Sequence, residues 1–201
     1  MRARLLTSIA LIVALAGCQL GQDAITSPND SGAPLASAAS AKGMSIGQPG
    51  HVVAHNGSVA LRNGVATMWA VQGQTRTMAL VYGDGTPFVT FTVPAGALVR
   101  DAAGTPLAPG DSVLITMSLP KPNAFAVRME PSGLRFDSHV PATLSFNLAR
   151  AGKAAMKSPS LSMWKQETLD APWLPVAATF DLQAHTATAA IPGFTIYAII
   201  Y

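Results

Sequence analysis

The chain contains one cysteine, Cys18, and a thiol is the most reactive side chain that the sequence offers. As the only cysteine it cannot form a disulfide within the chain. It follows a basic start, with Arg2 and Arg4, and an uncharged apolar run over residues 5–16. That run has the length of the apolar region of a secretory leader and falls short of the ~20 residues that span a bilayer. We therefore expect residues 1–17 to be a signal peptide, with Cys18 directly after its cleavage point.

The four residues Leu15-Ala16-Gly17-Cys18 resemble the lipobox of bacterial lipoproteins. The resemblance implies that the Cys18 sulfur receives a diacylglycerol and that the leader is cut between Gly17 and Cys18. Two or three acyl chains make a stable anchor, because each buried CH₂ contributes about 0.8 kcal/mol. The next residue is Gln19 rather than the Asp that commonly retains lipoproteins in the inner membrane, which implies the outer membrane in a host that has one. The alternative is that Cys18 is only a small apolar residue of the leader.

Two histidines, His51 and His55, lie four residues apart, a spacing that could direct both toward one metal ion. On a helix or on a strand, positions four apart share a face. The flanking Gly50 and the turn-forming pair Asn56-Gly57 argue against a helix, and no third ligand is evident. We therefore expect no metal site here.

A possible nucleophile, Ser112, follows Gly110 and Asp111 as in the opening of a Gly-Asp-Ser esterase block. Such a serine needs a strand-to-helix context and a histidine–carboxylate pair, whereas this segment predicts a turn leading into a strand. We expect His139 to lie in a loop, and the loop aspartates to bond their own backbone. The chain also lacks a glycine-rich phosphate loop and paired catalytic carboxylates. We therefore expect neither catalytic residues nor a cofactor.

Charge is sparse in this chain, at 11% of residues against the ~25% of an average soluble domain. Without Arg2 and Arg4 of the leader, 11 Lys and Arg face 10 Asp and Glu, a net charge of +1. There is no run of basic residues, so a nucleic-acid partner is not expected. Residues 22–50 are rich in Ser, Ala, Gly and Pro and have no aromatic side chain. With the lipidated Cys18, residues 18–50 are predicted to form a flexible linker to the membrane.

From about Val52 onward, apolar and polar residues alternate with the period of a strand that buries one face. Turn-forming segments such as 83–87, 103–111 and 120–123 separate the alternating runs. Only residues 149–157 are compatible with a short helix. Residues 51–201 are thus predicted to be an all-β domain, an antiparallel β-sandwich of about eight to ten strands. The residues expected to face its core are Met78, Leu80 and Tyr82; Val89, Phe91 and Val93; Val113, Ile115, Met117 and Leu119; Phe125, Val127 and Met129; Leu144, Phe146 and Leu148; and Phe180 and Leu182.

Four segments in order carry a family resemblance: FTVPAGAL (91–98), DSVLITMSLP (111–120), MEPSGLRFDSHVPATLSFNL (129–148) and the stretch 161–199. Together they resemble the ZU-five domain, a β-sandwich of ankyrins and netrin receptors, and more specifically its relatives in secreted bacterial lipoproteins. The resemblance covers about 88–201, and it implies a unit that mediates contacts with other proteins. Independently of it, Pro94 is suited to end a strand, and Gly96 and Gly133 to occupy turns with positive φ.

Some ZU-five units cut their own backbone at a His-Phe-Ser segment, with the serine hydroxyl as nucleophile. The matching residues here are Gly193, Phe194 and Thr195, so a hydroxyl remains but the histidine is missing. His185 is not assigned that role, since we expect it on the preceding strand. The leading interpretation is a membrane-anchored cell-envelope lipoprotein whose sandwich, without catalysis, binds a protein or a glycan. The alternative is a self-cleaving or hydrolytic module of the envelope.

Overall fold

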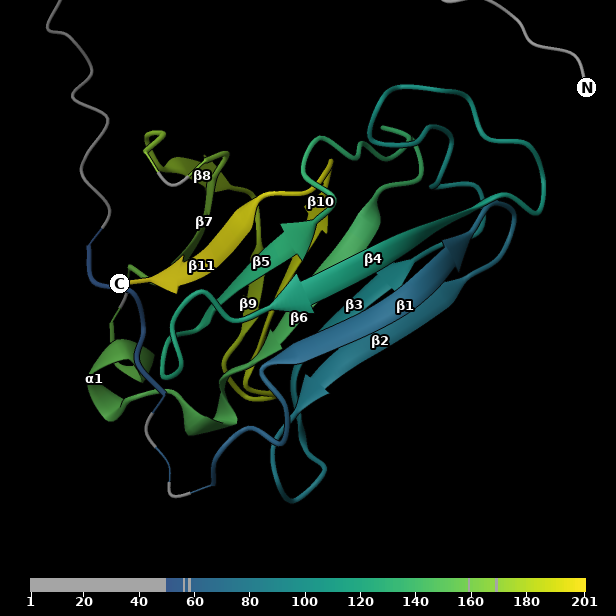
Figure 1. Cartoon of the computed structure of the whole chain (residues 1–201). Coiled ribbons are helices and arrows are strands. Elements are labelled where there is room, and N and C mark those ends of the chain that lie inside the picture. Colours follow the sequence, from purple (N-terminus) through teal and green to yellow (C-terminus); the bar gives the residue numbers. More distant parts are fainter. Residues whose placement is uncertain (1–49, 56, 58, 159, 169) are drawn as a thin grey trace, which may run out of the picture. The chain divides into compact units, whose positions relative to one another are not determined.

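The computed structural model describes residues 50–55, 57, 59–158, 160–168 and 170–201. The predicted signal peptide, Cys18 and all of the predicted linker except Gly50 lie outside the described residues. Two antiparallel β-sheets pack face to face (Figure 1), so the predicted all-β sandwich is confirmed. Among the described residues, no helix is long and apolar enough to cross a membrane.

One sheet has six strands and the other has five. The order in the first sheet is β1 (Val65–Val71), β4 (Ser112–Ser118), β5 (Ala126–Glu130), β11 (Ile196–Ile200), β7 (Ser162–Gln166) and β8 (Leu174–Val176). The order in the second is β2 (Arg76–Val81), β3 (Pro87–Val93), β6 (Ala142–Asn147), β10 (Thr186–Ile191) and β9 (Thr179–Asp181). The described residues thus form eleven strands, one more than the upper end of the predicted eight to ten, and the shortest are β8 and β9 with three residues each.

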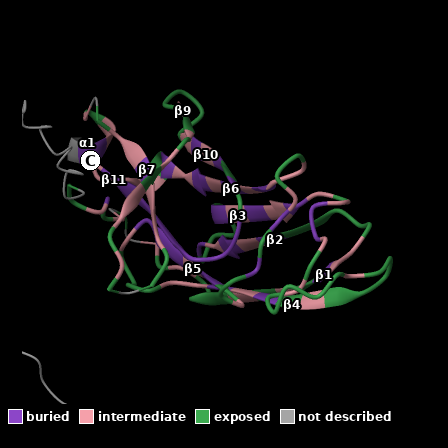
Figure 2. Ribbon diagram, turned by 90° about the horizontal axis from the view of Figure 1, so that it is seen from above, coloured by how far each residue is buried: buried purple, intermediate pink, exposed green. Residues whose placement is uncertain are grey.

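The core lies between the two sheets, where the strands turn their buried sides toward each other (Figure 2). The predicted alternation is confirmed in β3, where Val89, Phe91 and Val93 are buried and Thr90 and Thr92 are half-buried. Phe88, Phe125 and Phe146 meet with ring centroids 5.1–6.4 Å apart. At this spacing aromatic pairs contribute about 0.5–1.5 kcal/mol beyond the burial of their area.

One prediction needs correction. Leu182 is 47% exposed, because β9 ends at Asp181 and Leu182 already lies in the turn that leads to β10. Within residues 149–157, where a short helix was considered compatible with the sequence, the structure has the short helix α1, Lys153–Met156, and before it a 3₁₀ turn, Leu148–Arg150, and Ala151. Ala151 forms a β-bridge with His55, so extended backbone replaces the helix there.

The turn chemistry agrees with the sequence. Strand β3 ends at Val93, directly before Pro94, and Gly96 and Gly133 have φ of 87° and 89°. Glycine adopts this left-handed backbone without steric cost.

The last strand, β11, departs from simple alternation, because all five of its residues are buried. Tyr197 and Ile199 face the core between the sheets. Ala198 and Ile200 belong instead to a second, smaller cluster with Ala126. Half-buried residues packed against this cluster are Val52, Ala124, Trp164 and Trp173. The six-stranded sheet is therefore partly covered on its outer face as well.

Candidate functional site

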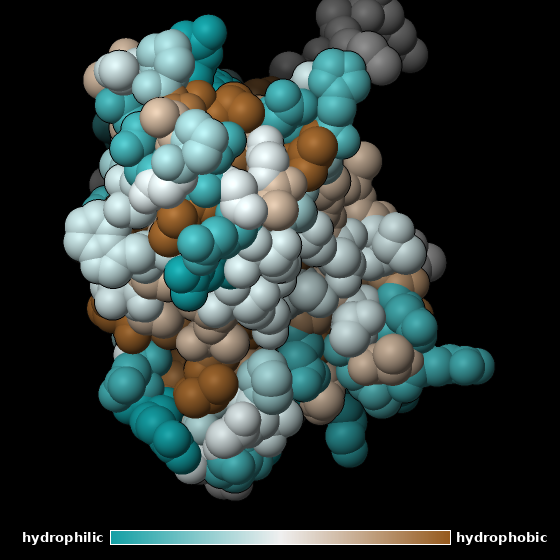
Figure 3. Space-filling model, turned by 90° about the vertical axis from the view of Figure 1, so that its right-hand side faces the viewer, coloured by the Kyte–Doolittle hydropathy of each residue, from teal (hydrophilic) through white to brown (hydrophobic). Residues whose placement is uncertain are grey.

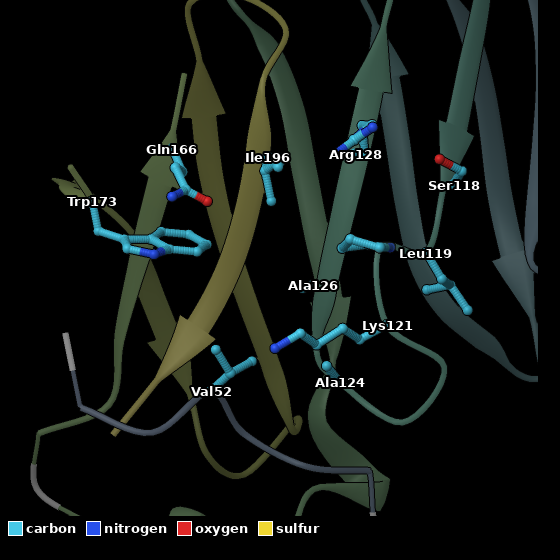
Figure 4. A pocket seen from close by; sticks show the side chains of 11 residues that line it. Val52, Ser118, Leu119, Lys121, Ala124, Ala126, Arg128, Gln166, Trp173 and Ile196 are labelled. Atoms are coloured by element: carbon cyan, nitrogen blue, oxygen red, sulfur yellow. The ribbon is translucent and has the colours of Figure 1, made fainter. Parts of the chain in front are cut away.

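A groove of about 600 Å³ lies on this outer face of the six-stranded sheet (Figure 4). Its size falls within the range of sites that bind small ligands, and apolar walls with a few polar groups are typical of such sites. We call this hollow "the groove", and its lining residues are Val52, Ser118, Leu119, Pro120, Lys121, Ala124, Ala126, Arg128, Gln166, Trp173 and Ile196.

One side of the groove is aromatic. Trp173 lies in the loop between β7 and β8, and its indole ring points into the groove toward Ile196 (Figure 4). The loop is fixed to β7 because Gln166 Nε2 donates a hydrogen bond of 2.9 Å to the Ala171 carbonyl oxygen. The neighbouring Trp164 donates from Nε1 to Ser162 Oγ at 2.8 Å. Trp173 thus offers a ring face to a ligand from a tethered loop.

The opposite side of the groove carries positive charge. Lys121 follows β4, and Arg128 is the middle residue of β5. In Figure 4 the Lys121 side chain extends across the lower part of the groove toward Val52. No described residue forms an ion pair with either cation, and no carboxylate lines the groove. The nearby Glu167 is already paired with Lys165, at 2.6 Å. The groove therefore has two cations whose charge is not balanced within it.

A second hollow, of about 580 Å³, lies near the first residues of the sandwich. Its lining contains His55 and Asn123 but no Lys, Arg, Asp or Glu. His55 stacks on Tyr82 with ring centroids 5.1 Å apart, and the guanidinium carbon of Arg150 lies 4.3 Å from the Tyr82 ring centroid. Arg150 Nη2 also donates to Asp84 Oδ2 at 2.5 Å.

The surroundings of His55 in this His55–Tyr82–Arg150 cluster oppose its protonation. Burial, with the charge of Arg150 as the lesser cause, lowers the pKa of His55 below its usual value. Burial raises the pKa of Tyr82 to about 12. Hydrogen bonds from the side chain and backbone of Thr86, assisted by Arg150, lower the pKa of Asp84 to about 2. His55 Nε2, Tyr82 Oη and Arg150 Nη1 are buried and have no hydrogen-bond partner among the described residues.

The residues compared with a self-cleaving segment lie just before β11. Phe194 is buried in the core against Phe91 and Phe136. The Thr195 hydroxyl donates to the Gln166 carbonyl oxygen, so its proton is directed at the backbone and not at a base. The sequence predicted that His185 lies on a strand, and this prediction is wrong. His185 lies in the turn between β9 and β10, with φ of 53°. That turn belongs to the other sheet, and the structure does not bring His185 and Thr195 together in any described interaction.

The other candidate residues occupy turns and strand ends. Ser112 begins β4 after a turn in which Asp111 Oδ2 accepts a hydrogen bond from the Ala108 N–H at 2.7 Å. His139 is 91% exposed in a loop and lies 3.3 Å from Asp137. Asp84 and Asp101 accept bonds from the backbone of Thr86 and Thr105, so the prediction for loop aspartates is confirmed at three positions.

The two histidines of the possible metal pair have separate neighbours. The ring of His51 lies 6.3 Å from that of Tyr201, whereas His55 stacks on Tyr82. Among the described residues, no three His, Cys, Asp or Glu side chains lie close enough to hold a metal ion.

The groove was not predicted from the sequence. Trp173, which lines it, and Trp164 pack against the outer face of the six-stranded sheet. One feature of the sequence did point to the covered outer face. In the closing run FTIYAIIY, no charged or strongly polar residue alternates with the apolar ones after Thr195, which indicates a strand that is covered on both faces.

No protein-family model matches the chain, and no curated protein matches it. The likeness to the ZU-five domain therefore stays a prediction, and the function of the chain has to be inferred from its fold, its groove and its sequence.

Proposed function

We propose that this protein is a lipid-anchored lipoprotein of the bacterial cell envelope that binds an acidic ligand in the groove. The lipobox-like segment before Cys18 supports the anchor, and the resemblance of residues 88–201 to ZU-five units supports a role in binding. The observation that carries the binding role is the groove itself: an aromatic wall opposite two cations that have no ion-pair partner in the part of the chain that the structure describes.

The charge pattern of the groove selects the ligand. Lys121 and Arg128 would repel a cationic ligand, and a neutral one would leave both charges uncompensated. A carboxylate can accept two parallel hydrogen bonds from the Arg128 guanidinium, an arrangement roughly twice as strong as neutral hydrogen bonds. The apolar floor and Trp173 would meanwhile cover the ligand's uncharged body. The chemistry recognised is thus a carboxylate on an apolar or ring-shaped body.

Calorimetric titration of the mature chain in detergent tests this proposal. One pair of ligands is a carboxylated oligosaccharide and its carboxyl-reduced form, and the other pair is an acidic peptide and its amidated form. Comparing the two pairs shows whether the carboxylate that binds belongs to a glycan or to a peptide. We expect binding of one carboxylated ligand, weakened at least tenfold, or about 1.4 kcal/mol, by Arg128→Gln. Trp173→Ala should weaken binding of both the charged and the neutral form.

The matched control is Arg76→Gln, which removes an exposed arginine from β2 in the other sheet. Its affinity should equal that of the wild type. Equal affinities for the Arg128 and Arg76 variants would contradict the assignment of the groove. Chemical turnover of the bound ligand would contradict a role limited to binding.

A further inference from the structure

Exposed apolar side chains gather on the outer face of β1 and β4, beside the groove. Trp69 on β1 is 59% exposed, and Leu114, its partner on β4, is 45% exposed. Val65 shares the face of β1 with Trp69 and is 53% exposed. The one other large hydrophobic residue that is exposed in the described part of the chain, Leu182, lies in a turn of the other sheet. Exposed apolar surface is therefore concentrated on a single face.

The strand register makes this area continuous with the groove. One row of paired residues crosses five neighbouring strands and consists of Val65, Ser118, Arg128, Ile196 and Gln166. The last four of these residues line the groove, and Figure 4 shows their side chains following one another across the sheet. Val65 extends the row by one strand beyond the groove. At the usual strand spacing and rise per residue, Trp69 lies about 16 Å from Arg128 on the same face.

Polar groups fill the surface between Arg128 and Trp69. The next row of paired residues consists of Thr67, Thr116 and Glu130, one from each of β1, β4 and β5. A threonine hydroxyl can donate and accept hydrogen bonds, whereas an ionised carboxylate such as that of Glu130 only accepts them. Glu130 forms no ion pair with any other described residue. From the groove outward, the face therefore presents positive charge, then hydroxyl groups with one carboxylate, and then an aromatic side chain beside a leucine.

Apolar and polar side chains are mixed on the side of the molecule where β1 lies. Figure 3 looks onto this side, the right-hand side of Figure 1, and shows hydrophobic side chains in small areas separated by polar ones. A membrane or a second copy of the chain would favour one continuous apolar area. A mixed surface instead suits a ligand that carries apolar and polar groups side by side.

Sugar chains have this mixed character. Each sugar ring has an apolar C–H face, which stacks on aromatic side chains such as Trp69 and Trp173, and hydroxyl groups around its rim. An extended peptide is disfavoured here, because it gains affinity by adding to a free strand edge. Strands β4 and β5 are each paired with a neighbour on both sides, so a ligand on their outer face meets mainly side chains.

The charges determine the order of the sugars along the face. Lys121 and Arg128 attract an acidic sugar into the groove, whereas Glu130 repels a second carboxylate next to it and accepts hydrogen bonds from the hydroxyl groups of a neutral sugar. We propose that the ligand of the groove is a glycan in which acidic and neutral sugars alternate, and that this chain extends from Trp173 across the outer face to Trp69. This inference rests on the proposed function, and it adds the class of ligand and a second stacking position, Trp69.

Calorimetric titration of the mature chain in detergent tests the inference with two probes, a disaccharide and an octasaccharide of hyaluronan, in which glucuronate alternates with a neutral sugar. The disaccharide is short enough to lie within the groove, whereas the octasaccharide can reach Trp69. We expect the octasaccharide to bind roughly tenfold more tightly, because it adds contacts at Thr116 and Trp69. Trp69→Ala should weaken octasaccharide binding by about fivefold and leave the disaccharide unaffected.

Two further variants serve as controls. Trp69→Phe keeps an aromatic ring and should retain most of the octasaccharide affinity. Leu182→Ala removes an exposed hydrophobic side chain from the turn between β9 and β10 and should bind both probes like the wild type. Both Trp69 and Leu182 are about half exposed or more, so these substitutions should leave the sandwich folded.

Arg128→Gln separates this inference from the proposed function. It should weaken the binding of both probes, because the groove holds an acidic sugar of each. Octasaccharide binding that Arg128→Gln weakens but Trp69→Ala leaves unchanged would overturn the extended site and retain the groove. An octasaccharide that does not bind the wild type would also overturn the inference, and the acidic peptide then decides the proposed function. Probe affinities that Arg128→Gln leaves unchanged would contradict both.

Discussion

His55 shows how a single half-buried residue couples the sandwich to pH. Its ring stacks on Tyr82, the charge of Arg150 is close enough to act on it, and its Nε2 has no hydrogen-bond partner among the described residues. Its backbone N–H also donates to the Asn123 carbonyl at 2.8 Å, so the backbone of the residue is fixed to the sandwich. Both the burial and the neighbouring guanidinium oppose a second positive charge there.

We predict that the free energy of unfolding falls as the pH drops below about 7. The unfolded chain binds a proton at His55 near pH 6.5, whereas the lowered pKa in the folded state delays that binding. The contribution of His55 to the free energy of unfolding is therefore fully present above the pKa that His55 has in the unfolded chain. It is lost as the pH falls toward the lower pKa of His55 in the folded chain. Urea unfolding at several pH values measures this, and His55→Gln should flatten the dependence.

The control for this experiment is His185→Asn. His185 is exposed, and asparagine tolerates its φ of 53° better than most residues. This variant should keep the full pH dependence of the wild type. An unchanged dependence in His55→Gln would show that His55 is not responsible.

At the scale of elements, the sequence predicts the strands with a clear period and misses features that depend on long-range pairing. Alternation locates β3 and β6 because each buries one face. It cannot locate the groove, because Lys121, Arg128 and Trp173 meet only through the pairing of β5 with β11 and of β11 with β7. Likewise, the sequence places a short helix within residues 149–157 but not its start at Lys153, because the bridge that keeps Ala151 extended joins it to His55, far away in the sequence.

The approach to β11 provides a prediction at this scale. Gly193 forms a bridge with Arg135, and a Cβ atom added to Gly193 would lie 2.5 Å from the Leu134 carbonyl oxygen. Because backbone must move to accommodate it, Gly193→Ala should lower the free energy of unfolding by about 1–3 kcal/mol. The control Gly64→Ala has no atom closer than 4.0 Å and should change it by less than about 0.5 kcal/mol. Thermal or urea unfolding compares the two, and equal losses would contradict the proposed close approach.

At the scale of the whole molecule, a folded sandwich is combined with an anchor that is inferred from the sequence. The sandwich buries a complete core of aromatic and aliphatic side chains, and its outer face offers a groove. The anchor rests on Cys18, on the apolar run before it and on the small residues Ala16 and Gly17. Only a cysteine can form the thioether to diacylglycerol, so we predict that the identity of residue 18 decides the location of the protein and leaves the folding of the sandwich unchanged.

The most direct test of the central claim is the mass of the mature N-terminus together with its membrane fraction. We predict that the wild-type chain begins at Cys18, carries acyl chains there and sediments with the membranes. Cys18→Ser should leave a soluble or uncleaved product whose sandwich still folds, which circular dichroism of the purified product can verify. A wild-type chain with an unmodified Cys18, or one cleaved elsewhere, would contradict the lipoprotein assignment and leave an ordinary secretory leader in its place.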